Sequence, residues 1–305
     1  MKSFAILWTG ASPSTRGIAL IVLSTFGFAG MHTLIRYVSA EIHPFEIALF
    51  RNLFGMVVFA PWLIRHGFAI LRTRRIAMHG LRAALNIVAM LAFFTGLSMT
   101  PIARVTALGF TAPVFAALLA VLFLGERFRF RRWAATICGF GGTLIVLRPG
   151  FEEIDAGSLL ILLSTFAWGI TLIVIKMLGR TDSSLTITAY MNITLGLLSF
   201  IPALFVWTAP SAVNLFWMLC IGVLGTFAQL AMAQALKEAD TGVVMPFDFL
   251  RLVWVSILGY VLFSEVPGLF TWVGGGVIFA SAAYLAYREN AQRREEAVTK
   301  IAPPG

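Results

Sequence analysis

The feature that most constrains this sequence is a series of long apolar runs separated by very short polar loops. A helix needs about 20 apolar residues to cross the roughly 30 Å hydrocarbon core of a bilayer. Ten runs reach that length, at 17–37, 44–64, 78–99, 103–124, 131–148, 157–178, 184–207, 214–236, 243–263 and 270–288. Because lipid offers no hydrogen bonds to an open backbone, the runs predict an all-α membrane protein with ten transmembrane helices.

The composition excludes a water-soluble protein. Charged residues make up 12% of the chain and hydrophobic residues 59%, whereas soluble domains carry about 25% charged residues. The net charge of +9 lies in short loops between apolar runs, without a basic stripe that would predict a nucleic-acid partner. The expected partner is instead the lipid bilayer. The two cysteines, Cys138 and Cys220, lie inside apolar runs, so no disulfide framework, metal site or cofactor is predicted.

The positive residues also predict the orientation. The segments on one side hold Lys2, Arg16, Arg65, Arg72, Arg74, Arg75, Arg82, Arg127, Arg129, Arg131, Arg132, Lys176, Arg180, Lys237, Arg288, Arg293, Arg294 and Lys300. The other side holds only Arg36, Arg104 and Arg148. Because positive residues concentrate on the cytoplasmic side, both termini are expected in the cytoplasm, with residues 289–305 forming a polar tail.

The chain repeats itself. The stretch "LSTFGFAG" at 23–30 returns as "LSTFAWGI" at 163–170, and "VLFLGERF" at 121–128 returns as "VLFSEVPG" at 261–268. The interval contains five predicted spans, and an odd number of spans inverts the second copy. We therefore expect two inverted five-helix repeats, 17–148 and 157–288. Alternating-access transporters use such repeats and place the substrate site between them, near the bilayer midplane.

Seven side chains that could form such a site lie deep within the apolar runs: Arg51, Asn86, Trp168, Asn192, Gln229, Asp248 and Arg251. A charged residue costs about 2.5–3.5 kcal/mol at the centre of a membrane helix. Intramembrane charges therefore usually face a bundle interior or a wet cavity. The arginines would donate to carboxylate, phosphate or carbonyl groups. The amides would donate and accept, and the indole would stack on a ring.

Structural alternatives stay open for each of these residues. Single amides also hold membrane helices together, and Trp168 could be a packing residue. Asp248 and Arg251 share a helix face at positions i and i+3, so they could neutralise each other only to ease insertion. His32 is expected near the outer interface, and Arg82 is close enough to the cytoplasmic face to reach water.

The doubled five-helix unit, the "LGE" that closes the fourth run and the "FSE" that closes the ninth resemble the EamA branch of the drug/metabolite transporter superfamily. The resemblance covers residues 17–288. It implies a ten-helix fold in the bacterial inner membrane and transport of small organic metabolites without ATP. Family substrates include amino acids, nucleotide sugars, purine-type metabolites, riboflavin and S-adenosylmethionine. The "PFDFLR" of the ninth run is similar to members that take up riboflavin or S-adenosylmethionine.

An integral-membrane enzyme and a channel are the two alternatives to a transporter. An integral-membrane enzyme would need catalytic or metal-binding motifs, and the sequence has no GxxxxGK[ST], HExxH or CxxC pair. A channel would need a filter-like segment, and none stands out. We therefore predict a secondary active transporter, not an enzyme, whose substrate is riboflavin, S-adenosylmethionine or an amino-acid-like metabolite. The direction of transport, coupling to a proton or another ion, and a monomeric or homodimeric state are left open.

Overall fold

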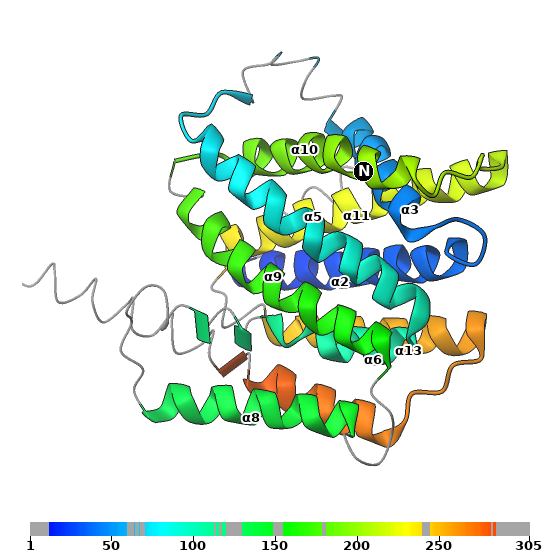
Figure 1. The fold of residues 1–305 in the computed structure, drawn as a ribbon. Coiled ribbons are helices and arrows are strands. Elements are labelled where there is room, and N and C mark those ends of the chain that lie inside the picture. The colour runs from blue at the N-terminus through cyan, green and yellow to red at the C-terminus, as the bar shows by residue number, and fades with distance from the viewer. Residues whose placement is uncertain are drawn as a thin grey trace, which may run out of the picture.

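The computed structural model describes residues 12–59, 64, 67, 71–112, 114–115, 118–119, 130–148, 155–178, 181–239, 245–281 and 283–284. These residues form helices joined by short connections, with no strand in the described ranges (Figure 1). The α-helices are α2 (Pro13–Val38), α3 (Pro44–Gly55), α5 (Ile76–Met99), α6 (Ile102–Gly109), α8 (Phe130–Leu147), α9 (Ala156–Leu178), α10 (Ser184–Leu204), α11 (Ala212–Glu238) and α13 (Leu250–Phe263). A further apolar helix spans Leu269–Ser281. Two 3₁₀ turns are η1 (Met56–Phe59) and η3 (Met245–Phe249).

The membrane character predicted from the apolar runs is confirmed. In the described part of the chain, five helices are long and apolar enough to cross a bilayer, and they lie in α2, α5, α9, α10 and α11. Large apolar side chains stand exposed on the outside of the bundle, among them Leu197, Phe205 and Tyr260. A surface of this kind fits lipid better than water.

Three of the predicted runs are not continuous α-helices. The run at 103–124 is interrupted after α6, which ends at Gly109 and is followed by a turn at Phe110 and Thr111. The run at 44–64 forms α3 and then turns into η1 at Met56. The run at 243–263 begins with η3, and α13 starts only at Leu250. Pro246 lies in the first turn of this segment, where its missing N–H leaves no helical bond unmade. Pro113, Glu126 and the tail 289–305 lie outside the described residues.

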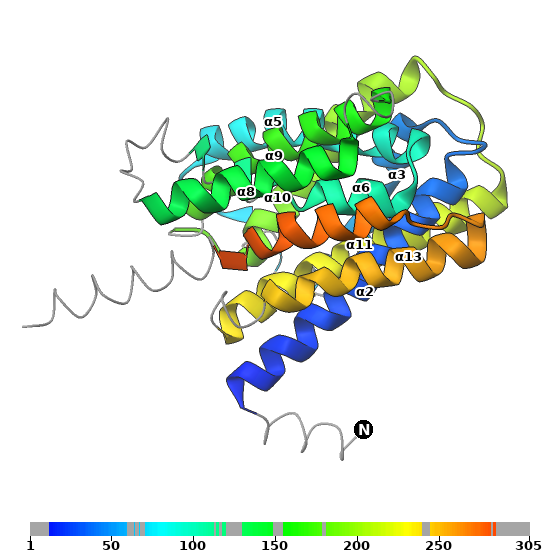
Figure 2. The same cartoon turned by 90° about the horizontal axis from the view of Figure 1, so that it is seen from below.

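Helices from the two halves of the chain pack in alternation. α2 packs along α11, α5 along α9, α3 against α10, and α6 against α13. Figure 2 shows α2, α11 and α13 grouped on one side of the molecule and α5 and α9 on the other. Each group therefore combines helices from both halves, and α3 and α10 meet between the groups.

The repeated "LSTF" motif makes the same contact in both halves. The hydroxyl of Ser24 on α2 donates to the carbonyl oxygen of Ala228 on α11 at 2.8 Å. The hydroxyl of Ser164 on α9 donates to the carbonyl oxygen of Ala89 on α5 at 2.7 Å. Each serine is the second residue of its motif, so the sequence repeat corresponds to a repeated interhelical bond.

Glycines allow the closest helix contacts. A Cβ atom placed on Gly96 of α5 would lie 2.8 Å from the carbonyl oxygen of Gly157 on α9. A Cβ atom on Gly142 of α8 would lie 2.9 Å from the carbonyl oxygen of Gly274 in the last helix. Small residues are common where membrane helices approach in this way. The bundle is therefore packed through backbone contacts that a side chain would disrupt.

Candidate functional site

A buried polar centre lies where α3 meets α10. Arg51 of α3 is only 6% exposed, and its Nη1 donates to Asn52 Oδ1 at 2.8 Å and to Asn192 Oδ1 at 3.5 Å. Asn52 in turn donates to the Met90 sulfur of α5 at 3.3 Å. Among the described residues Arg51 is thus held by amide oxygens and not by a carboxylate, and α3, α5 and α10 are joined around it.

Met191 extends the polar centre towards α11 and the beginning of α5. Its sulfur accepts from Gln229 Nε2 of α11 at 3.6 Å and from Arg82 Nη2 of α5 at 3.4 Å. Arg82 Nη1 donates to the carbonyl oxygen of Ile187 at 2.6 Å, and the residue is 4% exposed. The expectation that Arg82 reaches water is therefore wrong. The α5 face that carries it is covered by α10, so its guanidinium points into the protein.

Asp248 and Arg251 form an ion pair at the beginning of α13. Asp248 lies in η3, and Arg251 is the second residue of the α-helix that follows, with their side chains in direct contact. The Arg251 guanidinium also lies over the Phe28 ring of α2, 5.0 Å from its centroid. The side chains are 8% and 19% exposed, so the charges are largely shielded and α13 is tied to α2.

His32 belongs to this region, although the sequence places it at the outer interface. The residue is 7% exposed, and its ring centroid lies 5.0 Å from that of Phe93 and 6.3 Å from that of Phe28. Phe28 is also the ring over which the Arg251 guanidinium lies. The interfacial expectation is wrong because α5 and α13 cover this part of α2.

Several buried polar atoms of these helices have no hydrogen-bond partner in the described part of the chain. We call the following the unpartnered set: His32 Nδ1, both amide atoms of Asn86, Asn192 Nδ2, Thr226 Oγ1, Gln229 Oε1, Arg251 Nε and Trp254 Nε1. Buried polar atoms are almost always paired in folded proteins, and leaving one unpaired costs about 1–3 kcal/mol. A concentration of such atoms therefore offers both donors and acceptors to a polar ligand.

The seven residues selected from the sequence are not equally close to this centre. Arg51 and Asn192 are in contact, Gln229 joins them through Met191, and Asp248 pairs with Arg251. Asn86 lies one turn from Arg82 on the same face of α5 and is 3% exposed. Trp168 on α9 makes no hydrogen bond or ring contact with the described residues, so it is not joined to the others there. Thr226 and Trp254 were missed because single threonines and tryptophans are common in membrane helices.

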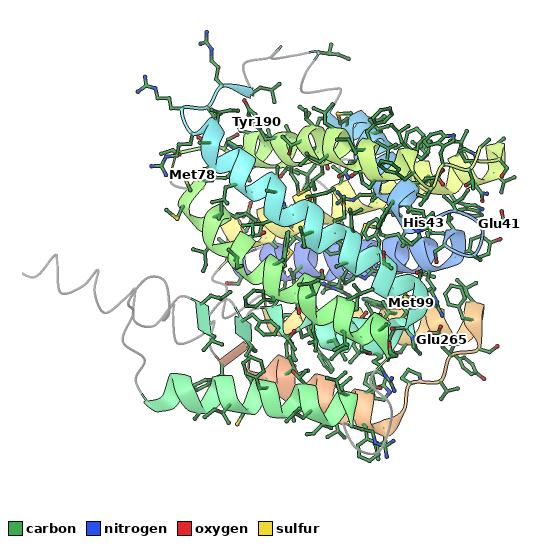
Figure 3. The ribbon with its side chains drawn as sticks, viewed as in Figure 1. Glu41, His43, Met78, Met99, Tyr190 and Glu265 are labelled. Atoms are coloured by element: carbon green, nitrogen blue, oxygen red, sulfur yellow. The ribbon has the colours of Figure 1, made fainter. Side chains whose placement is uncertain are left out.

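Contacts at the two ends of the bundle tie the helices together. Glu265 accepts from the backbone N–H of Ile102 at 2.8 Å and pairs with Arg36 at 3.4 Å. At the opposite end, His79 Nε2 lies 2.8 Å from Asp182 Oδ2 and its ring stacks on Tyr190 at 4.3 Å. Figure 3 shows Met78 and Tyr190 at one end and Met99 and Glu265 at the other.

Asp182 is held as a carboxylate by its neighbours. Burial by itself raises the pKa of this carboxyl group, but hydrogen bonds from His79, Thr73 and Thr181 outweigh that effect and bring the pKa below its usual value. The carboxylate therefore stays charged at neutral pH. It links the segment before α5 to the loop that precedes α10.

Cavities are found at the expected outer end. One of about 780 Å³ is lined by residues from the end of α2, the beginning of α11 and the end of α13, including Arg36, Glu41 and Asn214. A smaller one of about 100 Å³ lies beside Glu265 and Ser256, between α6 and α13. Neither is lined by the residues of the unpartnered set. The polar centre is therefore closed off from these cavities.

The helical bundle and its buried polar centre define a multi-pass membrane protein that handles small polar molecules. The sequence matches the EamA-like transporter family twice, over residues 15–148 and 155–287. The chain belongs to this family. The family resemblance noted from the sequence motifs is thereby confirmed, and the enzyme alternative is set aside because the family and the relatives are transporters.

Relatives with assigned transport functions cover almost the whole chain. An S-adenosylmethionine uptake transporter of Rickettsia bellii is 29% identical over 273 residues, which are 90% of this chain and 94% of that protein. A riboflavin transporter of Rhizobium johnstonii is 31% identical, with 92% and 94% covered. A pseudopaline exporter of Pseudomonas aeruginosa is 26% identical, with 88% and 95% covered.

The fold is also found in a solved crystal structure. That chain superposes with a TM-score of 0.63 at 17% sequence identity, covering 90% of this chain and 97% of the other. At this identity the likeness concerns the fold alone. The family match and the relatives make this protein a small-molecule transporter built from membrane-spanning helices.

Proposed function

We propose that this protein is a secondary active transporter that moves a small polar metabolite across the bacterial cytoplasmic membrane by alternating access. Its binding site is the buried polar centre, formed by Arg51, Asn86, Asn192, Gln229 and the Asp248–Arg251 pair. The two halves, 17–148 and 157–288, act as inverted repeats around it.

The unpartnered set is the observation that carries this proposal. Its atoms come from α2 and α5 in the first half and from α10, α11 and α13 in the second. A protein without a polar ligand gains nothing from unpaired donors and acceptors at this depth, because each lowers its stability. A substrate that hydrogen-bonds to them would restore the lost bonds on entry. The bound substrate would then hold together the helices that must separate to open the binding site.

The inverted arrangement is supported by the packing. α2 and α9 are the first helices of the two halves, and α5 and α11 are the third. The pair α2–α11 therefore joins the first helix of one half to the third helix of the other, and the pair α9–α5 does the same with the halves exchanged. Both pairs are observed, and each contains the equivalent serine-to-carbonyl bond. The family match to two consecutive segments of similar length points the same way. The site between the repeats would therefore face each side of the membrane in turn.

The substrate follows from the relatives and from the chemistry of the centre. Relatives named for S-adenosylmethionine and riboflavin support a ring-containing metabolite with several hydrogen-bonding groups. Amides that both donate and accept, together with guanidinium donors, suit such a molecule. An amino-acid-like metabolite is the other candidate, since an α-carboxylate matches a guanidinium group.

Flux measured in proteoliposomes tests the proposal. Purified protein is reconstituted and loaded separately with riboflavin, S-adenosylmethionine and a set of amino acids, and counterflow of the labelled compound is followed. A carrier saturates and exchanges, whereas a channel does not exchange. Gln229→Leu should abolish counterflow because it removes an amide from the centre. Gln234→Leu is the matched control, because Gln234 lies on the same helix but is exposed and bonds only to Glu238. Linear flux without exchange would contradict the proposal.

A further inference from the structure

Two buried guanidinium groups of the polar centre have no carboxylate partner. In the described part of the chain, Arg51 bonds to two amide oxygens, and Arg82 bonds to a carbonyl oxygen and a sulfur atom. Both residues are less than a tenth exposed. A buried cation is normally paired with an anion or with several strong acceptors. Neither arginine has an anionic partner.

Asp248 and Asp182 are already engaged, and Glu46, five residues before Arg51 on α3, accepts from Thr208 through Oε1. Asp248 pairs with Arg251, which leaves no net charge at the beginning of α13. Asp182, beyond the cytoplasmic end of α5, accepts from His79 at 2.8 Å and from Thr73 at 2.7 Å. No ion pair within 4.0 Å joins either carboxylate to Arg51 or Arg82. The described part of the polar centre therefore carries an excess of positive charge.

Arg82 is continuous with the rest of the centre. Its Nη2 shares the Met191 sulfur with Gln229, and the next residue of α10, Asn192, contacts Arg51. Asn86, one turn further along α5, has two unpartnered amide atoms. The Nε of Arg82 is itself buried and unpartnered. A row of donors thus runs from Arg51 past α10 to Arg82, whose Nε has no partner in the described part of the chain.

We propose that Arg82 is an anion-binding residue of the transport site, and that the substrate carries at least one carboxylate or phosphate group. This inference rests on the proposed transport function. The acidic oxygen atoms of the substrate would accept from Arg82 on the cytoplasmic side of the centre, while Arg51, Asn86 and Asn192 hold its neutral polar groups. Such charge-assisted bonds are stronger than neutral ones, so a neutral analogue of the same shape would bind more weakly.

Matched ligand pairs test this proposal. Thermal stability of the purified transporter is titrated with riboflavin and riboflavin 5′-phosphate, adenosine and adenosine 5′-monophosphate, and glutamine and glutamate. In at least one pair the acidic member should bind about ten-fold more tightly than its neutral partner. Arg82→Gln should remove this preference, and Arg82→Lys should restore part of it, because lysine keeps the charge but not the fork of donors.

A control variant distinguishes this role from a purely structural one. Arg75, near the same end of α5, also donates to a carbonyl oxygen and a methionine sulfur, those of Met177 and Met78, but its carbonyl contact is exposed. Arg75→Gln should leave the preference for acidic ligands unchanged. If Arg82 served packing alone, Arg82→Gln would lower stability equally for both members of each pair.

The outcomes separate the two proposals. Any of three results would overturn the role of Arg82. These are tighter binding of every neutral member, no stabilisation by any acidic member, and an acidic preference that survives Arg82→Gln. Counterflow of a neutral compound would still support the transport function in that case. Acidic ligands that bind through Arg82 but show no counterflow in proteoliposomes would contradict the transport function and leave the anion site standing.

Discussion

Asp248 and Arg251 show how single residues shape the site. Two charges at this depth are unfavourable in a membrane helix, yet the pair is in direct contact, and Arg251 also lies over Phe28. Mutual neutralisation explains why the segment tolerates the charges. It does not explain why Arg251 Nε is left unpartnered. A substrate acceptor is the partner that we expect for it.

The double variant Asp248→Asn with Arg251→Gln separates these two roles. Removing both charges keeps the hydrogen-bonding capacity, so insertion and folding should be retained while transport is lost. Asp248→Asn alone should destabilise the protein by about 3 kcal/mol more than the double change, because it leaves a buried cation without its partner. Uptake at equal expression and thermal unfolding are the measurements. Uptake near the wild-type level in the double variant would leave the pair a structural device only.

A substitution of Asn86 is expected to raise stability and to lower transport. Both of its amide atoms are buried and unpartnered. Asn86→Leu keeps the number and branching of the side-chain heavy atoms and removes the unsatisfied groups, so the ligand-free protein should gain about 1–3 kcal/mol in stability. Counterflow should be lost, because the substrate loses a donor and an acceptor. A fall in stability with transport retained would show instead that Asn86 holds neighbouring helices together.

At the scale of elements, the pairing of α5 with α9 depends on backbone contact at Gly96. A methyl group at this position would meet a carbonyl oxygen at 2.8 Å and the Ile161 side chain at the same distance. The carbonyl belongs to the backbone of α9 and cannot turn aside. The two helices would have to move apart, and the equivalent serine bond from α9 to α5 would lengthen with them.

Gly96→Ala is therefore expected to reduce the yield of folded protein and to lower its thermal unfolding temperature. Gly80→Ala serves as the control on the same helix, because nothing lies within 4 Å of the added methyl group. Alanine is the better helix former by about 1 kcal/mol, so this second change should be neutral or stabilising. Equal loss in both variants would contradict the role given to the α5–α9 contact.

At the scale of the whole molecule, the helices form two groups that each draw on both halves of the chain. α2, α11 and α13 lie together, α5, α6 and α9 lie together, and α3 meets α10 between them. The polar centre lies at this meeting place, with Arg51 and Asn192 in contact across it. A rocking movement of one group against the other would open the centre to either side in turn.

The orientation of the molecule remains a prediction that reporter fusions test. Because lysine and arginine concentrate at one side, fusions at the N-terminus, in the 66–77 loop, in the 125–131 loop and at the tail should report the cytoplasm. Fusions in the short connections that carry Arg36 and Arg148 should report the outside. A periplasmic signal from the 66–77 loop would overturn both the orientation and the count of ten spans, and with them the inverted repeat.

The sequence by itself was sufficient for the membrane class, the EamA family and most of the polar residues of the centre. These are local properties: a helix must be long enough to cross lipid, and a charge inside a membrane helix usually faces the bundle interior or a wet cavity. Arg51, Asn86, Asn192, Gln229, Asp248 and Arg251 were identifiable on this ground. The breaks at η1 and η3 were not, because an apolar run does not specify whether its backbone is α or 3₁₀.

The direction in which each side chain points was decided only by the tertiary structure. Arg82 was expected to reach water, but its guanidinium donates to the carbonyl oxygen of Ile187 on α10, more than 100 positions away. His32 was expected at the interface, but Phe93 of α5 covers it. Among the described residues, no hydrogen bond or ring contact joins Trp168 to the centre, although its expected depth in the membrane is suitable. Depth follows from position along one helix, whereas orientation depends on which distant helix packs against it.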